Sequence, residues 1–207
     1  MTAQAGSISS QLQAERRQLR QRVRAARRDM HPKARTTADR AIVSHILNLP
    51  EFRSARRIAL FLAFDGEPSM HDVIAAAAAR GKRVYAPVLT DAVMHFAELD
   101  TAAALATNFF GILEPRVGRA IDARELDLVL TPLVAFDDRG VRVGVGRGYY
   151  DRCFRFLLNR RHWRHPKLLG VAYELQRAPR LVRQPWDVLL AGVVTEAGVR
   201  RFGDPGP

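Results

Sequence analysis

The stretch RIALFLAFDGEPSMHDVIAAAAARGKRVYAPVL, residues 57–89, predicts a strand, a helix and a second strand. Its first part, Arg57–Phe64, is an almost continuous apolar run, which is typical of a strand that is buried on both faces. Asp72–Arg80 is rich in alanine and helical, and Gly81 follows as a helix C-cap. Arg83–Leu89 is the second strand. Because a helix that connects neighbouring strands leaves them parallel, we expect a βαβ unit here.

The segments around this unit predict more helices and strands. Before it, apolar residues recur at helical spacing between Gln11 and Met30, and a second helical stretch includes Ile42–Leu47. After it, residues 100–125 have no regular pattern, whereas Tyr149–Asn159 is expected to be helical. The later strands expected are Val93–Leu99, Leu126–Thr131, Leu168–Tyr173 and Val188–Thr195. Alternating strands and helices predict an α/β fold, a single three-layer domain with a mainly parallel central sheet flanked by helices, Rossmann-like.

Length and composition limit the class of protein. The 207 residues suffice for one large domain, with residues 1–10 as a flexible lead, 11–202 as the domain and 203–207 as a frayed tail. With 47% hydrophobic and 26% charged residues, the chain is globular rather than disordered. No apolar stretch reaches membrane-spanning length, and Cys153 is the single cysteine. We expect a cytoplasmic protein without a membrane partner, a monomer with a dimer as the alternative.

The net charge of +12 is unevenly distributed. Residues 15–40 carry a net charge of +7 and residues 139–183 one of +10, so the rest of the chain is net acidic. Two basic zones in an otherwise acidic chain indicate an anionic ligand that is held between them. At this level a nucleic acid, a nucleotide and a polyanionic small molecule all fit.

The most informative segment for chemistry is RVGVGRGYYDR, residues 142–152. Three alternating glycines precede a predicted helix, and missing Cβ atoms let backbone N–H groups approach phosphate oxygens. Arg142 and Arg147 can pair with phosphates, and Asp151 in the first helical turn can hold Mg²⁺. The spacing is neither that of a Walker A loop nor GxGxxG, so by its glycines alone a structural turn fits equally well.

Further motifs accompany this loop. TPLVAFD, residues 131–137, comes directly before it, and RRQLR, residues 16–20, lies near the N-terminus. FLAFDGE occupies residues 61–67, and PWD, residues 185–187, is followed by VVT at 193–195. In this order, from about residue 16 to 196, the motifs resemble the 5-formyltetrahydrofolate cyclo-ligase family, also called methenyltetrahydrofolate synthetase.

The resemblance implies a reaction. ATP and Mg²⁺ would drive closure of 5-formyltetrahydrofolate to 5,10-methenyltetrahydrofolate, with release of ADP and phosphate. The formamide carbon is a poor electrophile and its oxygen is a poor leaving group. Phosphorylation of the formyl oxygen makes it a good leaving group, and N10 of the folate can then attack the carbon. Positioning and charge neutralisation dominate such phosphoryl transfers.

The resemblance also implies residues for each ligand. For ATP these are Arg16, Arg17, Gln18, Leu19, Arg20, Arg142, Val143, Gly144, Val145, Gly146, Arg147, Gly148, Tyr149 and Tyr150. For the folate they are Leu62, Glu67, Val145, Gly146, Arg147, Gly148 and Tyr149, and for Mg²⁺ they are Asp151 and Asp187. Arg147 and Tyr149 would be catalytic. Arg147 would neutralise charge on the transferred phosphoryl group, Glu67 would hydrogen-bond the pterin ring, and Leu62 would pack on that ring.

Several alternatives stay open at this stage. After the glutamate that corresponds to Glu67, relatives usually have an acidic residue and then Thr, but this chain has Ser69 and Met70 there. A folate- or nucleotide-binding relative without catalysis is therefore one alternative, and a basic nucleic-acid-binding protein is another. The N-terminal arginines are also compatible with a solvated helix face or a transit peptide. Glu67 and Asp187 are equally compatible with local turns and caps.

Overall fold

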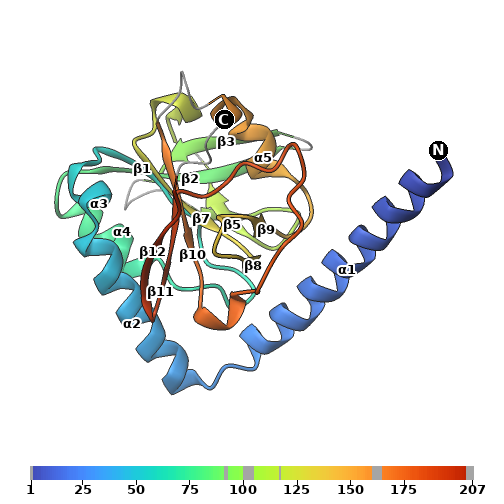
Figure 1. Cartoon of the computed structure of the whole chain (residues 1–207). Coiled ribbons are helices and arrows are strands. Elements are labelled where there is room, and N and C mark those ends of the chain that lie inside the picture. The colour runs from blue at the N-terminus through green and yellow to red at the C-terminus, as the bar shows by residue number, and fades with distance from the viewer. Residues whose placement is uncertain (1, 91–92, 100–104, 117, 160–164, 204–207) are drawn as a thin grey trace.

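The computed structural model describes residues 2–90, 93–99, 105–116, 118–159 and 165–203, with side chains from residue 11 onward. A large sheet forms the centre of this structure (Figure 1). Its strands are β1 (Arg57–Ala59), β2 (Arg83–Thr90), β3 (Val93–Glu98), β6 (Ala120–Ile121), β7 (Leu128–Pro132), β10 (Lys167–Val171), β11 (Gly192–Thr195) and β12 (Gly198–Arg201).

The strand order is β12–β11–β10–β7–β1–β2–β3–β6. The pairings β11–β10, β10–β7, β7–β1 and β1–β2 are parallel, whereas β12, β3 and β6 add to the two ends as antiparallel strands. Helix α4 (His71–Ala78) connects β1 to β2, so the predicted βαβ unit is confirmed. The α/β class and the mainly parallel sheet are confirmed as well.

Helices cover both faces of the sheet. Helices α2 (Pro32–Asn48), α3 (Pro50–Ser54) and α4 pack on one face, and α5 (Tyr149–Cys153) with the 3₁₀ turn η2 (Arg155–Leu158) packs on the other. In Figure 1 the N-terminal part of α1 (Thr2–Arg28) projects away from the sheet. The remaining elements are η1 (Ala123–Glu125), η3 (Glu174–Gln176), and the strand pairs β4 (Leu105–Thr107) with β5 (Leu113–Pro115) and β8 (Ala135–Phe136) with β9 (Arg142–Val143).

The central strands are apolar on both sides because both sides are covered. Leu128 and Leu130 of β7 belong to the core cluster under α2, α3 and α4, whereas Val129 packs in the cluster that includes Phe154 and Leu157. All three β7 side chains are fully buried. This two-sided burial explains why the central strands have continuous apolar sequences rather than an alternating pattern.

The structure differs from the prediction at the ends of several elements. Helix α1 begins at Thr2, so the predicted flexible lead is helical. Strand β1 ends at Ala59, although Leu60 and Phe61 beyond it are also buried, and burial of this non-strand segment explains the longer apolar run. The predicted helix 149–159 is divided into α5 and η2, and the C-terminal strand begins only at Gly192.

Two segments contain more regular structure than the sequence predicted, and part of a third lies outside the described residues. Residues 100–125 were expected to be irregular, yet they contain the β4–β5 hairpin, β6 and η1. Strand β12 was not predicted at all. Of the predicted tail, residues 204–207 lie outside the described ranges. None of the helices described is long and apolar enough to cross a membrane.

Gly140 in the turn between β8 and β9 provides a test of this architecture. Its φ is +79°, and a Cβ there would lie 2.7 Å from the carbonyl oxygen of Leu190. Gly81 has φ of +65° with no atom near its Cβ position. We expect Gly140→Ala to lower the free energy of unfolding by about 2–4 kcal/mol and Gly81→Ala by only about 1 kcal/mol, measured by urea denaturation. Equal losses would contradict the close packing of this turn against residue 190.

Candidate active site

A pocket lies where the parallel strands β1 and β7 end. Phe61 and Leu62 come after β1, Pro132 is the last residue of β7 and Leu133 follows it, and all four line the pocket. Its empty space is about 1270 Å³, including the part that opens to solvent. The chain continues from β1 to β2 on one side, and β7 lies on the other side of β1. Ligands of open α/β sheets bind at such points, outside the carboxyl ends of the strands.

The glycine loop forms one wall of this pocket, between β9 and α5. Gly146 has φ of +103°, and a Cβ there would lie 3.3 Å from the guanidinium carbon of Arg20. Arg20 Nε donates a hydrogen bond to the carbonyl oxygen of Gly144 at 2.8 Å. Burial, with a smaller contribution from Arg16, lowers the pKa of Arg20. The two basic zones of the sequence therefore meet in this pocket.

Each of the two carboxylates predicted to hold Mg²⁺ is paired with an arginine. Asp151 Oδ1 accepts a hydrogen bond from Arg142 Nη2 at 2.7 Å and one from the backbone of Val188 at 3.2 Å. Asp187 Oδ2 accepts one from Arg16 Nη2 at 2.9 Å, and it also accepts the Gln184 N–H at 2.8 Å. Arg142 also donates to the carbonyl oxygen of Val188, so the pairs lie next to each other in the fold.

The donor set at these carboxylates fits a magnesium ion that keeps part of its water shell. Within the described residues there is no cluster of three or more His, Cys, Asp or Glu side chains that could enclose a metal. Mg²⁺ is usually held by one or two carboxylates together with waters and substrate phosphates. Asp151 and Asp187 both line the pocket, and the hydrogen bonds described above use one oxygen of each carboxylate. The site can therefore complete a magnesium shell only with water and a phosphate ligand.

The opposite wall is mainly apolar and contains one carboxyl group, that of Glu67, whose side chain is only 11% exposed. Its Oε2 accepts the backbone N–H of Phe64 at 3.2 Å, and its Oε1 lies 3.8 Å from Arg27 Nη1. Burial raises the pKa of Glu67 to about 7, and Asp65 also raises it, while Arg27, the Phe64 N–H and Arg24 act in the other direction. The carboxyl group therefore changes its charge near neutral pH.

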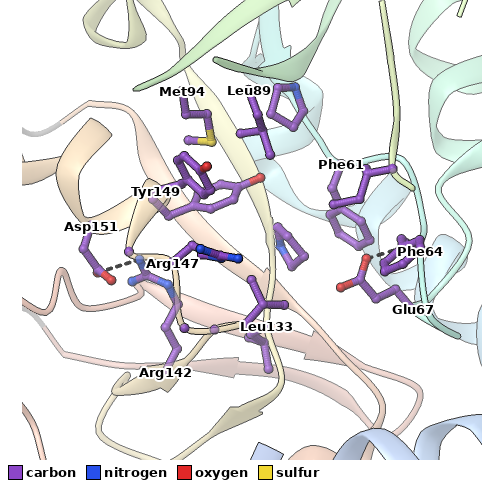
Figure 2. A pocket seen from close by; sticks show the side chains of 18 of the residues that line it. Phe61, Phe64, Glu67, Leu89, Met94, Leu133, Arg142, Arg147, Tyr149 and Asp151 are labelled. Carbon is purple, nitrogen blue, oxygen red and sulfur yellow. Dashed lines mark hydrogen bonds and ion pairs between the residues drawn. The ribbon is translucent and has the colours of Figure 1, made fainter. Parts of the chain in front are cut away.

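Figure 2 shows how the two walls face each other. Asp151 and Arg142 lie on one side of the pocket, and Glu67 lies on the other side with Phe64. Arg147 and Tyr149 lie between them. One end thus carries arginines and carboxylates, and the other is lined by rings with one carboxyl group. Such a pocket suits a ligand that is anionic at one end and a hydrogen-bonding heterocycle at the other.

The two tyrosines of α5 differ in their surroundings. The Tyr150 hydroxyl is buried and has no hydrogen-bond partner among the described residues, and its burial raises its pKa. A buried hydroxyl without a partner is costly, and Tyr150 lines the pocket, so a ligand atom can satisfy it. The Tyr149 ring contacts Phe110 edge-on, with centroids 6.4 Å apart, and the Arg152 guanidinium lies 5.1 Å from the Tyr149 ring centroid.

The pocket brings together most residues that the sequence assigned to ligands. Those lining it are Arg16, Arg20, Leu62, Glu67, Arg142, Gly144, Val145, Gly146, Arg147, Gly148, Tyr149, Tyr150, Asp151 and Asp187. Their individual roles stay predictions. Arg17 and Gln18 lie outside the lining, on the exposed part of α1, and Leu19 and Val143 pack in the apolar cluster with Val141 and Leu181. Helical periodicity and the alternation of side chains along β9 turn these residues away from the pocket.

Sequence reasoning missed a part of the lining that is apolar except for Asn108. These residues are Phe61, Phe64, Pro87, Leu89, Met94, Asn108, Ile112, Pro132, Leu133 and Trp186. Leu133 follows the predicted strand 126–131, so the rule that ligands bind beyond strand ends could have found it, whereas Phe61 lies inside the predicted strand 57–64 and follows β1 only in the structure. Asn108 and Ile112 belong to the β4–β5 hairpin, for which the sequence carries no signal. Trp186 is 61% exposed beside Asp187.

Comparison with known proteins agrees with this geometry. The model of the 5-formyltetrahydrofolate cyclo-ligase family matches residues 12–196. The chain belongs to this family. It is 35% identical to the 5-formyltetrahydrofolate cyclo-ligase of Haemophilus influenzae, with 87% of this chain and 97% of the relative covered. Identity to the Escherichia coli K12 enzyme of the same name is 33%, with 86% and 98% covered. The chain is therefore a ligase of this family.

Solved structures of this family have the same fold. The NMR structure of Aquifex aeolicus 5,10-methenyltetrahydrofolate synthetase matches with a TM-score of 0.79 at 29% identity, over 93% of this chain and 95% of that one. The Mycoplasma pneumoniae 5,10-methenyltetrahydrofolate synthetase matches with a TM-score of 0.70 at 23% identity, over 87% and 98%. The central sheet and its helices are thus those of the cyclo-ligases.

The departure of this chain from the cyclo-ligase pattern lies beside the pocket rather than in it. Met70 is buried in the core under α4, and the Ser69 hydroxyl accepts the backbone N–H of His71 at 3.4 Å. Neither residue lines the pocket. Both lie at the start of α4, where Met70 is the N-cap residue.

The raised pKa of Glu67 leads to a pH-dependent stability. A carboxyl group with a higher pKa in the folded than in the unfolded state makes the free energy of unfolding fall as pH rises between the two values, here 4.5 and about 7. Glu67→Gln removes this loss. We expect the stability of the variant relative to the wild type to increase by about 1–3 kcal/mol from pH 4 to pH 8, measured by urea denaturation. A difference that does not change with pH would contradict the burial of this carboxyl group.

Proposed function

We propose that this cyclo-ligase converts 5-formyltetrahydrofolate to 5,10-methenyltetrahydrofolate in an ATP- and Mg²⁺-dependent reaction that releases ADP and phosphate. The observation that carries the proposal is the pairing of two unlike walls in one pocket. The glycine loop with Arg16, Arg20 and Arg142 faces an apolar wall that holds Glu67. The family names of the relatives agree with this substrate and product.

The glycine-loop wall would bind the triphosphate. Arg16 and Arg20 reach it from α1, and Arg147 extends from the loop itself. Guanidinium groups pair with phosphate oxygens through two parallel hydrogen bonds, and the backbone of a glycine-spaced loop adds N–H donors. Since no Cβ crowds Gly144 or Gly146, phosphate oxygens can approach this backbone closely.

The opposite wall would bind the pterin. Glu67 accepts hydrogen bonds when ionised and both accepts and donates when protonated, which matches the amide and amine groups of a pterin ring. Leu62 and Phe61 would pack on the ring faces, and the unpartnered Tyr150 hydroxyl would donate to a ligand oxygen. The formyl group would then lie between the two walls, beside Arg147 and Tyr149.

In this arrangement the protein contributes mainly geometry and charge. The formyl oxygen would attack the terminal phosphorus of ATP, and ADP would leave. The folate N10 would then attack the formyl carbon and close the five-membered ring. The phosphate would depart with the former formyl oxygen, and the N10 proton would pass to the leaving phosphate or to water. Arg147 would hold the transferred group and stabilise its charge, as oriented donors do in other phosphoryl transfers.

Asp151 and Asp187 would hold Mg²⁺ together with water and the nucleotide phosphates. When bound, the ion neutralises phosphate charge and orients the leaving group. Arg142 fixes the orientation of Asp151 through their 2.7 Å hydrogen bond, and Arg16 does the same for Asp187 at 2.9 Å. The arginines would thus hold both carboxylates in place at the pocket.

The same proposal covers the partners and the place of action. ATP and a reduced folate are both anions, which accounts for the two basic zones without a nucleic acid partner. We also propose that the protein acts in the cytoplasm as a monomer, with a dimer as the alternative.

A direct assay tests the reaction. Purified protein mixed with MgATP and 5-formyltetrahydrofolate should produce the near-ultraviolet absorption band of the methenyl product, and the band should not grow when ATP is left out. Folded protein that binds both ligands without product formation would instead favour the binding relative without catalysis.

Arg147→Ala tests the role of the glycine loop. We expect kcat to fall by about 10²–10³-fold, because oriented donors act mainly on charge that develops during transfer. The melting temperature should stay unchanged, since Arg147 is on the surface of the loop. Arg155→Ala serves as the control, because this exposed arginine of η2 does not line the pocket. Similar kcat values for both variants would contradict the assignment.

A further inference from the structure

Arg27 is a buried arginine to which the proposed reaction assigns no role. It is 1% exposed, and it lies near the C-terminal end of α1. Its Nε donates to the carbonyl oxygen of Asp65 at 3.0 Å, and its Nη2 donates to the Asp65 carboxylate at 3.2 Å. Its Nη1 lies 3.5 Å from the Leu133 carbonyl oxygen and 3.8 Å from Glu67 Oε1. One side chain thus joins α1, the loop after β1 and the end of β7.

The surroundings of Glu67 make Arg27 its main positive neighbour. Asp65, on the same loop, repels a negative charge on Glu67, and the more distant Arg24 attracts it. Tyr150 of α5 faces the same region with a neutral hydroxyl. A guanidinium group stays charged when buried, so its attraction to a carboxylate is permanent and acts through a low dielectric. Burial favours the neutral form of Glu67, and Arg27 opposes that effect.

Helix α1 carries Arg27 on the same face as the arginines of the other wall. Arg20 and Arg27 follow Arg16 by four and eleven residues, which are about one and three turns of an α-helix. Arg16 contacts Asp187 and Arg20 contacts the glycine loop, while Arg27 contacts the Glu67 loop. One helix face therefore reaches both ends of the pocket.

We propose that Arg27 is a positioning residue for Glu67, which sets the orientation and charge of the carboxyl group that receives the folate ring. This inference rests on the proposed function, because it takes Glu67 to be the pterin-binding group. Arg27 itself does not line the pocket, so it acts through Glu67.

Other contacts keep the loop in place when Arg27 is changed. Arg35 Nη1 donates to the carbonyl oxygen of Gly66 at 2.7 Å, and Arg24 Nε donates to Asp65 Oδ2 at 2.5 Å. Arg28 also pairs with Asp65, at 3.5 Å, and has no contact with Glu67 in the described structure. Arg28→Met is therefore a matched control, because it removes a neighbouring arginine with the same partner on the same helix.

The test is a double-mutant cycle on binding. The dissociation constants of 5-formyltetrahydrofolate and of ADP are measured by calorimetry for the wild type, Arg27→Met, Glu67→Gln and the double variant. We expect each single change to weaken folate binding by about tenfold or more and the double variant to bind like Glu67→Gln alone. ADP binding should stay within about threefold of wild type, as should both ligands in Arg28→Met.

A second readout is the pH dependence of folate binding. Arg27→Met should move the midpoint of this pH dependence to higher pH, because the variant lacks the positive charge that lowers the pKa of Glu67. Arg27→Lys, which keeps the charge, should leave the midpoint near that of the wild type. If Arg27→Met does not fold, Arg27→Lys replaces it in the cycle, where loss of the planar fork should weaken folate binding.

The results that overturn the inference are distinct from those that overturn the proposed function. If Arg27→Met weakens folate binding as much in the Glu67→Gln background as in the wild type, Arg27 acts independently of Glu67 and the inference is wrong. If Glu67→Gln alone leaves folate binding unchanged, the assigned role of Glu67 fails and the inference fails with it. A missing methenyl product, with the binding cycle as expected, would overturn the catalytic proposal alone.

Discussion

The docking of α1 through arginine side chains is the interaction on which the pocket depends. The apolar contribution of this helix is small, because Val23 is its main buried aliphatic residue and Leu19 is only partly covered. Arg16, Arg20 and Arg27 instead hydrogen-bond to Asp187, Gly144 and Asp65, which are far apart in the sequence. A guanidinium group has five N–H donors in a rigid fork, so one side chain can join several segments. The helix thereby becomes a wall that both ends of the pocket share.

Much of the arginine excess is used inside the fold. Arg24, Arg27 and Arg28 all pair with Asp65, and Arg142 pairs with Asp151. Such pairs gain from low dielectric only when further hydrogen bonds satisfy the buried groups, and the contacts to backbone carbonyls do this here. The number of arginines in the chain therefore overstates how many are available to a ligand. Arg20 and Arg147 line the pocket where the glycine loop meets α1.

The charge state of the pocket is set by burial as much as by pairing. Asp151 and Asp187 each accept a hydrogen bond from an arginine. In contrast, burial is the largest influence on the pKa of Glu67, and the Arg27 guanidinium lies 3.8 Å from its carboxyl group. Its pKa of about 7 is the result of this balance. Two kinds of carboxyl group thus lie in one pocket, two that are hydrogen-bonded to arginines and one, that of Glu67, that can be neutral at physiological pH. This difference matches a ligand with phosphates at one end and an uncharged ring at the other.

Local sequence determined the βαβ unit, the parallel strands, the glycine loop and the family, because continuous apolar runs, helical periodicity and short motifs are properties of neighbouring residues. Most of the residues that it assigned to ligands line the pocket, yet it also assigned Leu19 and Val143, which pack in an apolar cluster. Only the tertiary structure decided that β1 ends at Ala59, that the β4–β5 hairpin contributes Asn108 and Ile112, and that Arg27 meets Glu67. These features depend on contacts between segments that are distant in the chain. Hydrophobicity along the sequence cannot distinguish a strand from a buried loop. The local sequence likewise cannot distinguish a paired arginine from a solvated one.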